Sequence, residues 1–530
     1  MECEIIFDLS PPYRRLITLP LLRFRWVFCQ LEVLRHCFPS NLRHTLEELP
    51  NSLDGTYKRI LNEINIANQV HAYRLLQCLV VALRPLRVEE LAEMLALDLT
   101  AGGIPKFNAN WRWDDQEEAV LSACSSLVSV IIDNGNRIVQ FSHFSVKEFL
   151  TSNRLASCTE DVSQFHIPIE PSHVILAQAC LAVLVCLDDS TDQDSVKQTP
   201  LYKYSARYWD DHARVGNVES QITDAIDFFF DMDNPHFSSW VRSEVPYEFL
   251  RDSVKEVRTR RDEPRLAAPF CFAARRGLHG LLERLIIKHP QQVNQLGSCH
   301  GTPLHASALG GHIKVAQLLV AHGANINSRC GDDFTALHIA SREGHFKIVK
   351  WFLEHGAEVN SRNKGGLTPL HLAVSHGHLD ACRILLEHNA EVNSRDYRKT
   401  TPLLLASELG YANIVQLLLD HNADVYVCDG DGDTPLHCSA LGGQLKVSLL
   451  LLKLNVDVNS RNNRGLAPLH QASMGWEEGS AGVVRLLLDY GADVQARDLS
   501  GRTPAEVARG SEQQEIVQVL SQPCSEHALE

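Results

Sequence analysis

The stretch NKGGLTPLHLAVSHGHLDACRILLEHNAEVNSR, residues 363–395, decides the fold because its pattern returns throughout the C-terminal half of the chain. Its tetrapeptide, which begins at Thr368, recurs at intervals of 33 residues in six copies, and a weaker copy follows after 36. The other copies begin at Thr302, Thr335, Thr401, Thr434, Ala467 and Thr503. Such a fixed period predicts a solenoid of stacked helix pairs, in which each pair buries its apolar faces against its neighbours.

Each repeat contains the elements that a helix pair needs. Gly366 permits a tight turn, the Thr368 hydroxyl is placed to cap the inner helix, and Pro369 lies in the first turn, where its missing N–H costs nothing. The inner helix is expected to end at Gly377. The outer helix then carries apolar residues at helical spacing, namely Leu379, Cys382, Leu385 and Leu386.

This stretch resembles the ankyrin-repeat consensus. The resemblance implies that the threonine and histidine of T-P-L-H bond to each other and to nearby backbone, as for His371. An asparagine ladder keeps the same step, with Tyr426 substituting once: Asn294, Asn327, Asn360, Asn393 and Asn459. Asn294 reveals an earlier, degenerate copy, so we expect about eight repeats with atypical caps at both ends.

Composition limits the possible function classes. The chain of 530 residues carries a net charge of -15, which argues against a general nucleic-acid binder. Its 15 cysteines form no C-x-x-C pair, so we expect free thiols, no metal and no cofactor. The longest apolar run, residues 174–187, is too short to span a bilayer, and the N-terminus shows no export signal. These features predict a cytoplasmic protein.

The N-terminal half has a different pattern. Helical spacing predicts helices over residues 57–66, 71–83, 88–97 and 116–125. Two β-branched runs, 127–132 and 137–141, follow and are joined by Asp133-Asn134-Gly135-Asn136, a strong hairpin signal. Helices followed by a hairpin predict a winged-helix-like domain. Further helices are expected over 175–187, 205–211 and 221–230.

Several segments of this half resemble fungal NACHT-ankyrin proteins. LPNSLDGTYKRIL (49–61), LRPLRVEELAEML (83–95) and VQFSHFSVKEFL (139–150) are similar to the winged-helix region of that family. FRWVFCQLEVLRHC (24–37) resembles the last helix of the NACHT module, and PLYKYSARYWDDHAR (200–214) resembles the connector before the repeats. The resemblance implies a nucleotide-dependent signalling switch, proposed for non-self recognition or cell death, whose repeats sense a partner.

The sequence departs from that family at the phosphate-binding loop. G-x-x-x-x-G-K-[ST] cradles phosphates, and the chain contains no Gly-Lys dipeptide. About 23 residues precede the NACHT-like helix, whereas a nucleotide-binding unit needs roughly a hundred or more. NTP hydrolysis is therefore not carried over; a truncated gene model and a natural fragment both remain open.

The predicted fold is mainly α: an ankyrin-repeat solenoid preceded by a winged-helix-like and helical N-terminal half. The predicted domains are a NACHT-end remnant (1–50), a winged-helix-like domain (51–155), a helical connector (156–262), the ankyrin repeats (263–523) and a tail (524–530).

Candidate chemistry is weak. Most of the 25 histidines recur in register and therefore serve the repeat. Ser142 and His143, with Ser145 nearby, could combine a nucleophile with a base, but adjacent residues on a strand point to opposite faces, and no G-x-S-x-G turn accompanies them. Asp114, Asp115, Glu117 and Glu118 are expected to start a helix favourably. The candidate recognition helix VEELAEMLALDL is acidic, which disfavours DNA binding and favours a packing role.

Protein recognition remains as the function. We expect a non-enzymatic scaffold or sensor that binds a protein partner with the positions that the repeat framework leaves free. On the inner helices these are Leu309, Arg342, Glu343, Ser375, His376, Glu408, Leu409, Leu441 and Met474. At the hairpin tips they are Asp332, Lys364, Tyr397, Arg398, Asp431 and Arg464. The alternatives are an NTP-dependent switch whose P-loop lies outside this sequence, a winged-helix DNA binder and a ubiquitin-ligase adaptor.

Overall fold

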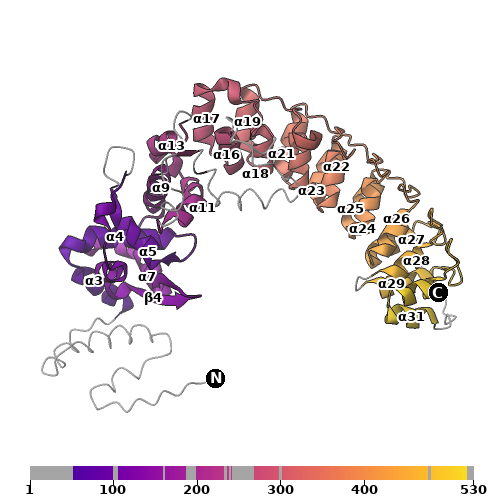
Figure 1. Cartoon of the computed structure of the whole chain (residues 1–530), viewed down its shortest axis with the longest axis horizontal. Helices are drawn as coiled ribbons and strands as arrows, with labels where there is room; N and C mark the ends of the chain where they lie inside the picture. Colours follow the sequence, from indigo (N-terminus) through magenta and orange to yellow (C-terminus); the bar gives the residue numbers. More distant parts are fainter. Residues whose placement is uncertain are drawn as a thin grey trace, which may run out of the picture. The chain divides into compact units, whose positions relative to one another are not determined.

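The computed structural model describes residues 52–98, 106–158, 161–186, 199–231, 236–237, 240, 268–297, 301–475 and 479–521. The predicted NACHT-end remnant (1–50) and the tail (524–530) lie outside these residues. The chain divides into two compact units, residues 1–262 and 263–530 (Figure 1).

The first unit begins with a winged helix. Its elements are α3 (Leu53–Glu63), α4 (Gln69–Val81), β1 (Leu86–Arg87), α5 (Val88–Glu93), β2 (Leu97–Asp98), β3 (Lys106–Phe107), α6 (Gln116–Cys124), β4 (Val128–Asp133), β5 (Asn136–Phe141), α7 (Phe144–Leu150) and α8 (Asn153–Ala156). The predicted hairpin is β4–β5, in which Val130 pairs with Val139. Its turn places Asn134 at φ 46° and Gly135 at φ 80°, the left-handed pair that a two-residue hairpin loop favours.

Two details of this domain differ from the sequence prediction. The helix expected over 88–97 ends at Glu93, because the chain passes through a short 3-10 turn into β2, where Leu97 pairs with Phe107 of β3. Strand β1 was not predicted from the sequence; it is only two residues long and completes the sheet in the order β1-β5-β4. The acidic helix start is confirmed, since Asp115 Oδ1 accepts from the Glu118 N–H at 3.0 Å.

The described residues of the first unit that follow the winged helix are mainly helical. They form α9 (Ile169–Val185), α11 (Tyr202–Ala213), α12 (Val218–Gln221) and α13 (Thr223–Phe229). The long apolar helix α9 packs against α11 and starts earlier than the predicted residue 175. A series of hydrogen bonds joins α9 and α11 to the winged helix. The Leu83 N–H donates to Tyr204 Oη at 3.1 Å, Tyr204 Oη lies 2.9 Å from His212 Nε2, and His212 Nδ1 lies 2.7 Å from His173 Nδ1.

The second unit is a row of helix pairs, of which the described residues show eight. The pairs are α16 (Ala268–Arg276) and α17 (His279–Lys288), α18 (Pro303–Gly310) and α19 (Ile313–Ala321), α20 (Ala336–Arg342) and α21 (Phe346–Glu354), α22 (Pro369–Ser375) and α23 (Leu379–Glu387), α24 (Pro402–Leu409) and α25 (Ala412–Asp420), α26 (Pro435–Leu441) and α27 (Leu445–Leu452), α28 (Pro468–Met474) and α29 (Ser480–Asp489), and α30 (Pro504–Gly510) and α31 (Gln514–Ser521).

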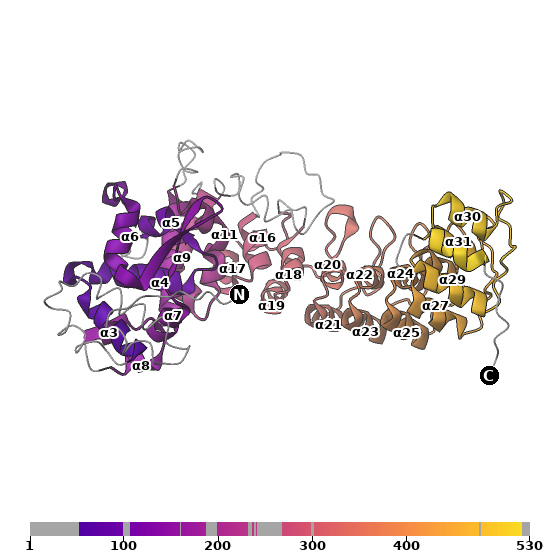
Figure 2. The same ribbon diagram turned by 90° about the horizontal axis from the view of Figure 1, so that it is seen from below.

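The pairs stack in sequence order. Inner helices α20 and α22 lie between the hairpin tips and outer helices α21 and α23 (Figure 2). Leu370, Ala373, Cys382 and Leu385 are at most 1% exposed, so each pair buries its apolar residues against its neighbours. Gly366 adopts φ +78°, and a Cβ there would come within 3.0 Å of the Tyr397 nitrogen, which explains glycine at this turn. The predicted solenoid is confirmed.

Candidate protein-binding surface

The T-P-L-H histidines hold successive repeats together. The Thr368 N–H donates to Nδ1 of His371 at 3.2 Å, so the ring proton lies on Nε2 and is donated to the Thr400 carbonyl in the next hairpin at 3.1 Å. The Thr368 hydroxyl in turn caps α22 by accepting from the His371 N–H. Equivalent bonds from Nε2 join His305 to Phe334, His338 to Leu367, His437 to Leu466 and His470 to Arg502.

Burial keeps these rings neutral. His338 and His371 are 0% exposed and His305 is 2% exposed. Desolvation lowers the pKa of His305 and His338 to about 4, and it also lowers the pKa of His371, His437 and His470. A neutral ring with both nitrogens engaged supports the framework and has no lone pair left for a metal ion.

Other histidines fix the ends of the helices. His345 and His378 donate from Nε2 to the carbonyls of Leu309 and Arg342 in the preceding inner helix, at 3.2 and 2.9 Å, and Gln444 does the same for Glu408 at 3.2 Å. His355, His388 and His421 bond through Nδ1 to a carbonyl of their own outer helix. The prediction that histidine register reflects repeat structure is confirmed for these residues. Among the described residues, no group of three or more His, Cys, Asp or Glu side chains is placed to hold a metal ion.

The asparagine ladder adds a second connection between repeats. Asn327 Nδ2 donates to the Gly356 carbonyl at 3.1 Å, and its Oδ1 accepts from the Glu358 N–H at 2.9 Å. Asn294, Asn360, Asn393 and Asn459 repeat this pair of bonds. Together the two ladders leave little freedom in the backbone of the hairpins.

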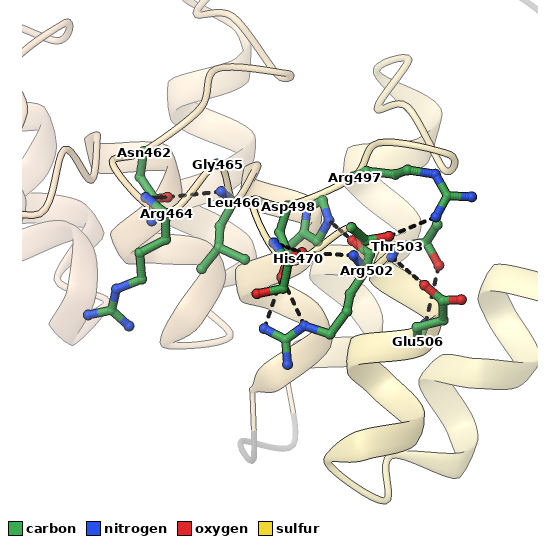
Figure 3. Close-up of polar contacts among 12 residues, drawn as sticks. Asn462, Arg464, Gly465, Leu466, His470, Arg497, Asp498, Arg502, Thr503 and Glu506 are labelled. Carbon is green, nitrogen blue, oxygen red and sulfur yellow. Dashed lines mark hydrogen bonds and ion pairs between the residues drawn. The ribbon is translucent and has the colours of Figure 1, made fainter.

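The hairpin tips form one continuous row. The N–H of Lys364 donates to the Asp332 carbonyl at 2.9 Å, and the same bond joins Tyr397 to Gly365 and Gly430 to Arg398. Asn463 to Asp431 and Leu499 to Arg464 continue the series. Figure 3 shows the C-terminal part of the row, where Asp498 accepts from the backbone of its own turn and from the Arg502 guanidinium. The tip side chains are therefore presented at regular positions by a fixed backbone.

The predicted tip residues are all exposed, but their charges are not equally free. Lys364 Nζ lies 3.7 Å from Asp332 Oδ1, and Arg464 Nη2 lies 3.9 Å from Asp431 Oδ1. Each of these ion pairs joins two neighbouring tips. Between these pairs, Tyr397 is 74% exposed and Arg398 has no ion pair with any described residue. The centre of the row thus offers an open aromatic ring and an uncompensated cation.

The predicted inner-helix residues gather at the C-terminal ends of their helices. Arg342 ends α20, Ser375 ends α22, Leu441 ends α26 and Met474 ends α28; Leu309, Glu408 and Leu409 lie in the last turns of α18 and α24, and Glu343 and His376 follow their helices directly. Arg342 Nε donates to Glu343 Oε1 at 2.9 Å, and Ser375 Oγ lies 2.9 Å from His376 Nδ1. Leu409 and Leu441 are 41% and 40% exposed. An inner helix of seven residues such as α20 separates these ends from the tips by roughly 10 Å. The structure therefore places the candidates in two rows that run along the stack.

The sequence reasoning missed other exposed residues of the hairpins. Leu499 is 79% exposed at the tip position of Tyr397, and Tyr426 is 69% exposed at the interruption of the asparagine ladder. An arginine also recurs before five of the tips, at 329, 362, 395, 461 and 497, with Cys428 at the equivalent position of one repeat. The register of the repeat contains this signal.

In the first unit, the acidic residues of the predicted recognition helix are largely buried. Glu90 is 0% exposed and receives two bonds from Arg84, at 2.7 and 2.6 Å, and one from the Arg87 N–H at 2.9 Å. Hydrogen bonds and the charge of Arg84 outweigh desolvation and lower the pKa of Glu90. Glu93 is 1% exposed and pairs with Arg112. This helix is therefore packed through two of its carboxylates, which agrees with the packing role that the sequence predicted.

His143 and Ser145, which are two residues apart, lie in contact, whereas the expectation of opposite faces concerned the adjacent pair Ser142 and His143. Their side chains lie 2.6 Å apart between Nδ1 and Oγ because His143 is the N-cap of α7, not a strand residue. Ser145 Oγ also lies 2.8 Å from Tyr57 Oη. No described carboxylate bonds to the His143 ring, so the pair lacks the group that would orient a catalytic base.

No helix of the described residues is long and apolar enough to cross a membrane.

Comparison with known proteins agrees with this architecture. The model of ankyrin repeats (3 copies) matches residues 270–363, 357–429, 394–462 and 421–498, and the model of the GPI inositol-deacylase winged helix domain matches residues 61–161. A Monascus ruber protein named azaphilone pigments biosynthesis cluster protein L is 30% identical over 290 residues, which are 51% of this chain and 59% of that protein. The human ASB11 ankyrin repeat domain is 27% identical, with a TM-score of 0.38, and the match covers 42% of this chain and all of that domain.

The chain thus spans less than two thirds of this curated relative. The C-terminal half consists of ankyrin repeats, which imply a protein-binding scaffold, and the N-terminal half contains a winged helix domain of the GPI inositol-deacylase type.

Proposed function

We propose that this chain is a non-enzymatic sensor that captures a partner protein along its two rows of candidate residues. The observation that supports the proposal is the contrast between framework and free positions. The histidine and asparagine ladders repeat the same bonds from one repeat to the next, while the tips and the inner-helix ends change from Asp332 to Tyr397 and from Arg342 to Leu441. A surface with a fixed backbone and varied side chains suits the recognition of one protein among many.

The first unit would connect capture to a response. Hydrogen bonds from the Leu83 N–H to Tyr204 and between Tyr204 and His212 join its winged helix to its helical connector. Arg87 Nη2 also donates to the Pro200 carbonyl at 3.4 Å. A rigid unit of this kind suits docking to a nucleotide-binding partner in cytoplasmic signalling or non-self recognition.

Duplex DNA binding is not part of the proposed function. On the wing, the exposed Arg137 already pairs with Glu89 at 2.8 Å and Glu117 at 3.0 Å. Phosphate binding would have to compete with both carboxylates, in a chain of net charge -15.

The test is a comparison of partner capture by three forms of the full chain. One carries Arg342→Ala, Tyr397→Ala and Glu408→Ala; a control carries Lys314→Ala, Lys347→Ala and Arg383→Ala on outer helices α19, α21 and α23. Proteins retained from an extract are quantified by mass spectrometry. We expect at least one partner to be retained by the wild type and the control and to be reduced about tenfold or more with the first variant. Equal retention by all three forms would show that the candidate rows do not bind it.

A further inference from the structure

A row of exposed arginines follows the hairpin arms, at one position per repeat. The arginine row comprises Arg329, Arg362, Arg395, Arg461 and Arg497, and Cys428 interrupts it once. Nη1 of Arg329 donates to the Arg362 carbonyl at 2.8 Å, and Nη1 of Arg362 donates to the Arg395 carbonyl at 2.8 Å. Arg461 makes the same contact with the Arg497 carbonyl. The guanidinium groups of these three arginines therefore lie over the arm of the next repeat, while Arg497 Nη1 donates to the Gly501 carbonyl of its own repeat at 2.7 Å.

Little of the charge of this row is compensated by described carboxylates, although Arg497 lies close enough to Glu506 to interact with its charge. Across the part of the chain that the structure describes, no carboxylate forms an ion pair with any of the five arginines. A guanidinium has five N–H donors, and the carbonyl contacts use one or two of them, so most donors remain available. Arg398 and Lys399, next to Arg395 in the sequence, are also exposed and form no ion pair with a carboxylate of the described ranges. This stripe is cationic although the whole chain carries a net charge of -15.

The spacing of the row limits what can bind it. Packed helices lie about 8–10 Å apart, so successive arginines recur at roughly that distance. In a β-strand, side chains on one face recur every ~6.6 Å, which does not match. In a polyproline II helix, with three residues per turn and a rise of ~3.1 Å, every third side chain points the same way at ~9.3 Å.

We propose that the arginine row binds an acidic segment of the partner protein in the polyproline II conformation, with a carboxylate at every third residue. This inference rests on the proposed function, because it identifies the chemistry of the partner. Arg329, Arg362 and Arg395 form its uninterrupted part and would engage three successive carboxylates, each through two parallel N–H···O bonds. Spacing alone does not exclude nucleic acid, since every third phosphate of one strand, at ~3.4 Å per charge, recurs at ~10.2 Å. The net charge of -15 disfavours nucleic acid, and the experiment below compares it directly with the peptide.

The register of the peptide provides the first test. A fluorescent peptide of four Glu-Pro-Pro repeats is titrated with the full chain and followed by anisotropy at low salt. A second peptide has the same composition with its glutamates in one block, and a third replaces glutamate by glutamine. We expect the block peptide to bind about fivefold more weakly than the repeating one and the glutamine peptide to show no binding. Equal binding of the repeating and block peptides would overturn the proposal, as would tighter binding of an oligothymidylate of about 12 nucleotides.

Variants provide the second test. Arg362→Gln with Arg395→Gln should weaken the repeating peptide roughly fivefold or more, as expected for two exposed ion pairs. Arg383→Gln on outer helix α23 makes one such charge change away from the row and should leave binding unchanged. Circular dichroism melting shows whether each variant remains folded. An equal loss with Arg383→Gln would contradict the proposal. If peptides fail to bind while partner capture still depends on Arg342, Tyr397 and Glu408, the proposed function stands and the arginine row is purely structural.

Discussion

At the scale of single residues, the T-P-L-H histidine connects the start of its own helix to the backbone of the next hairpin, 29 residues away. The His338 ring is 0% exposed, accepts from the Thr335 N–H at 3.2 Å and donates to the Leu367 carbonyl at 3.1 Å. Removing the ring leaves a cavity, a buried N–H and a buried carbonyl without their partner. Each of these effects destabilises a folded protein.

We therefore expect His338→Ala to lower the free energy of unfolding by about 3 kcal/mol. The matched control is His388→Ala, which removes a half-buried ring whose described bond is to its own outer helix, at the Ile384 carbonyl. That change should cost less than about 1 kcal/mol. Urea unfolding of the full chain, followed by circular dichroism, measures both. Equal losses for the two variants would show that the bond between repeats does not decide stability.

Most of the fold could be predicted because individual residues of the repeat each have one structural role. Thr368, Pro369 and His371 specify a helix start, and six copies remove doubt about the period. The strand β1 could not be predicted, because two residues carry no periodicity and only the pairing of Leu86 with Val139 creates it. The burial of Glu90 also depends on a partner, Arg84, that pattern alone does not place beside it.

Part of the candidate surface could also be predicted from the register of the repeats. The register showed which positions are free at the tips, such as Tyr397, but not which free charges neutralise each other. Lys364 with Asp332 and Arg464 with Asp431 become pairs only when the hairpins stack. The arginine row could not be predicted as a binding site, because a residue that recurs at one position of successive repeats is usually structural. Only the structure shows that no described carboxylate forms an ion pair with these arginines.

At the scale of the helix pair, the ladders are weakest around the hairpin that precedes Thr434. Leu404 replaces the histidine of the preceding repeat, and Tyr426 replaces the ladder asparagine. By register, an asparagine at 426 would donate to the Asn455 carbonyl and accept from the Asp457 N–H, as Asn393 does with Asn422 and Asp424. Tyr426 is instead 69% exposed, so its loss removes little packing.

Tyr426→Asn should therefore stabilise the repeat unit by about 1 kcal/mol, the net gain expected from two hydrogen bonds at a partly exposed site. Hydrogen exchange should slow at the backbone of residues 455–459, which join the ladder in the variant. Tyr397→Asn is the control, because that tyrosine is equally exposed but lies at a tip outside the ladder. If both variants shift the unfolding midpoint by the same amount, the replacement of an exposed tyrosine by asparagine, rather than the ladder, is the cause.

At the scale of the whole molecule, the buried histidines link stability to pH. Desolvation lowers the folded-state pKa of His305 and His338 from 6.5 to about 4 and lowers that of His371, His437 and His470. Below pH 6.5 these histidines bind protons in the unfolded chain, whereas their buried rings stay neutral in the folded protein. Stability is therefore complete above pH 6.5 and is lost as the pH falls toward 4. A shift of this size is on the order of 3 kcal/mol for each of the first two rings.

We expect the free energy of unfolding to fall steeply between pH 6.5 and about 4.5, measured by urea titration in steps of about half a pH unit. Relief of repulsion in a chain of net charge -15 acts in the opposite sense, so the slope of the wild type alone does not identify the histidines. His338→Gln removes one buried ring and should make the slope shallower; His388→Gln is the control for replacing a histidine outside the T-P-L-H motif. A slope that is the same in all three proteins would mean that the buried rings are not what destabilises the stack in acid.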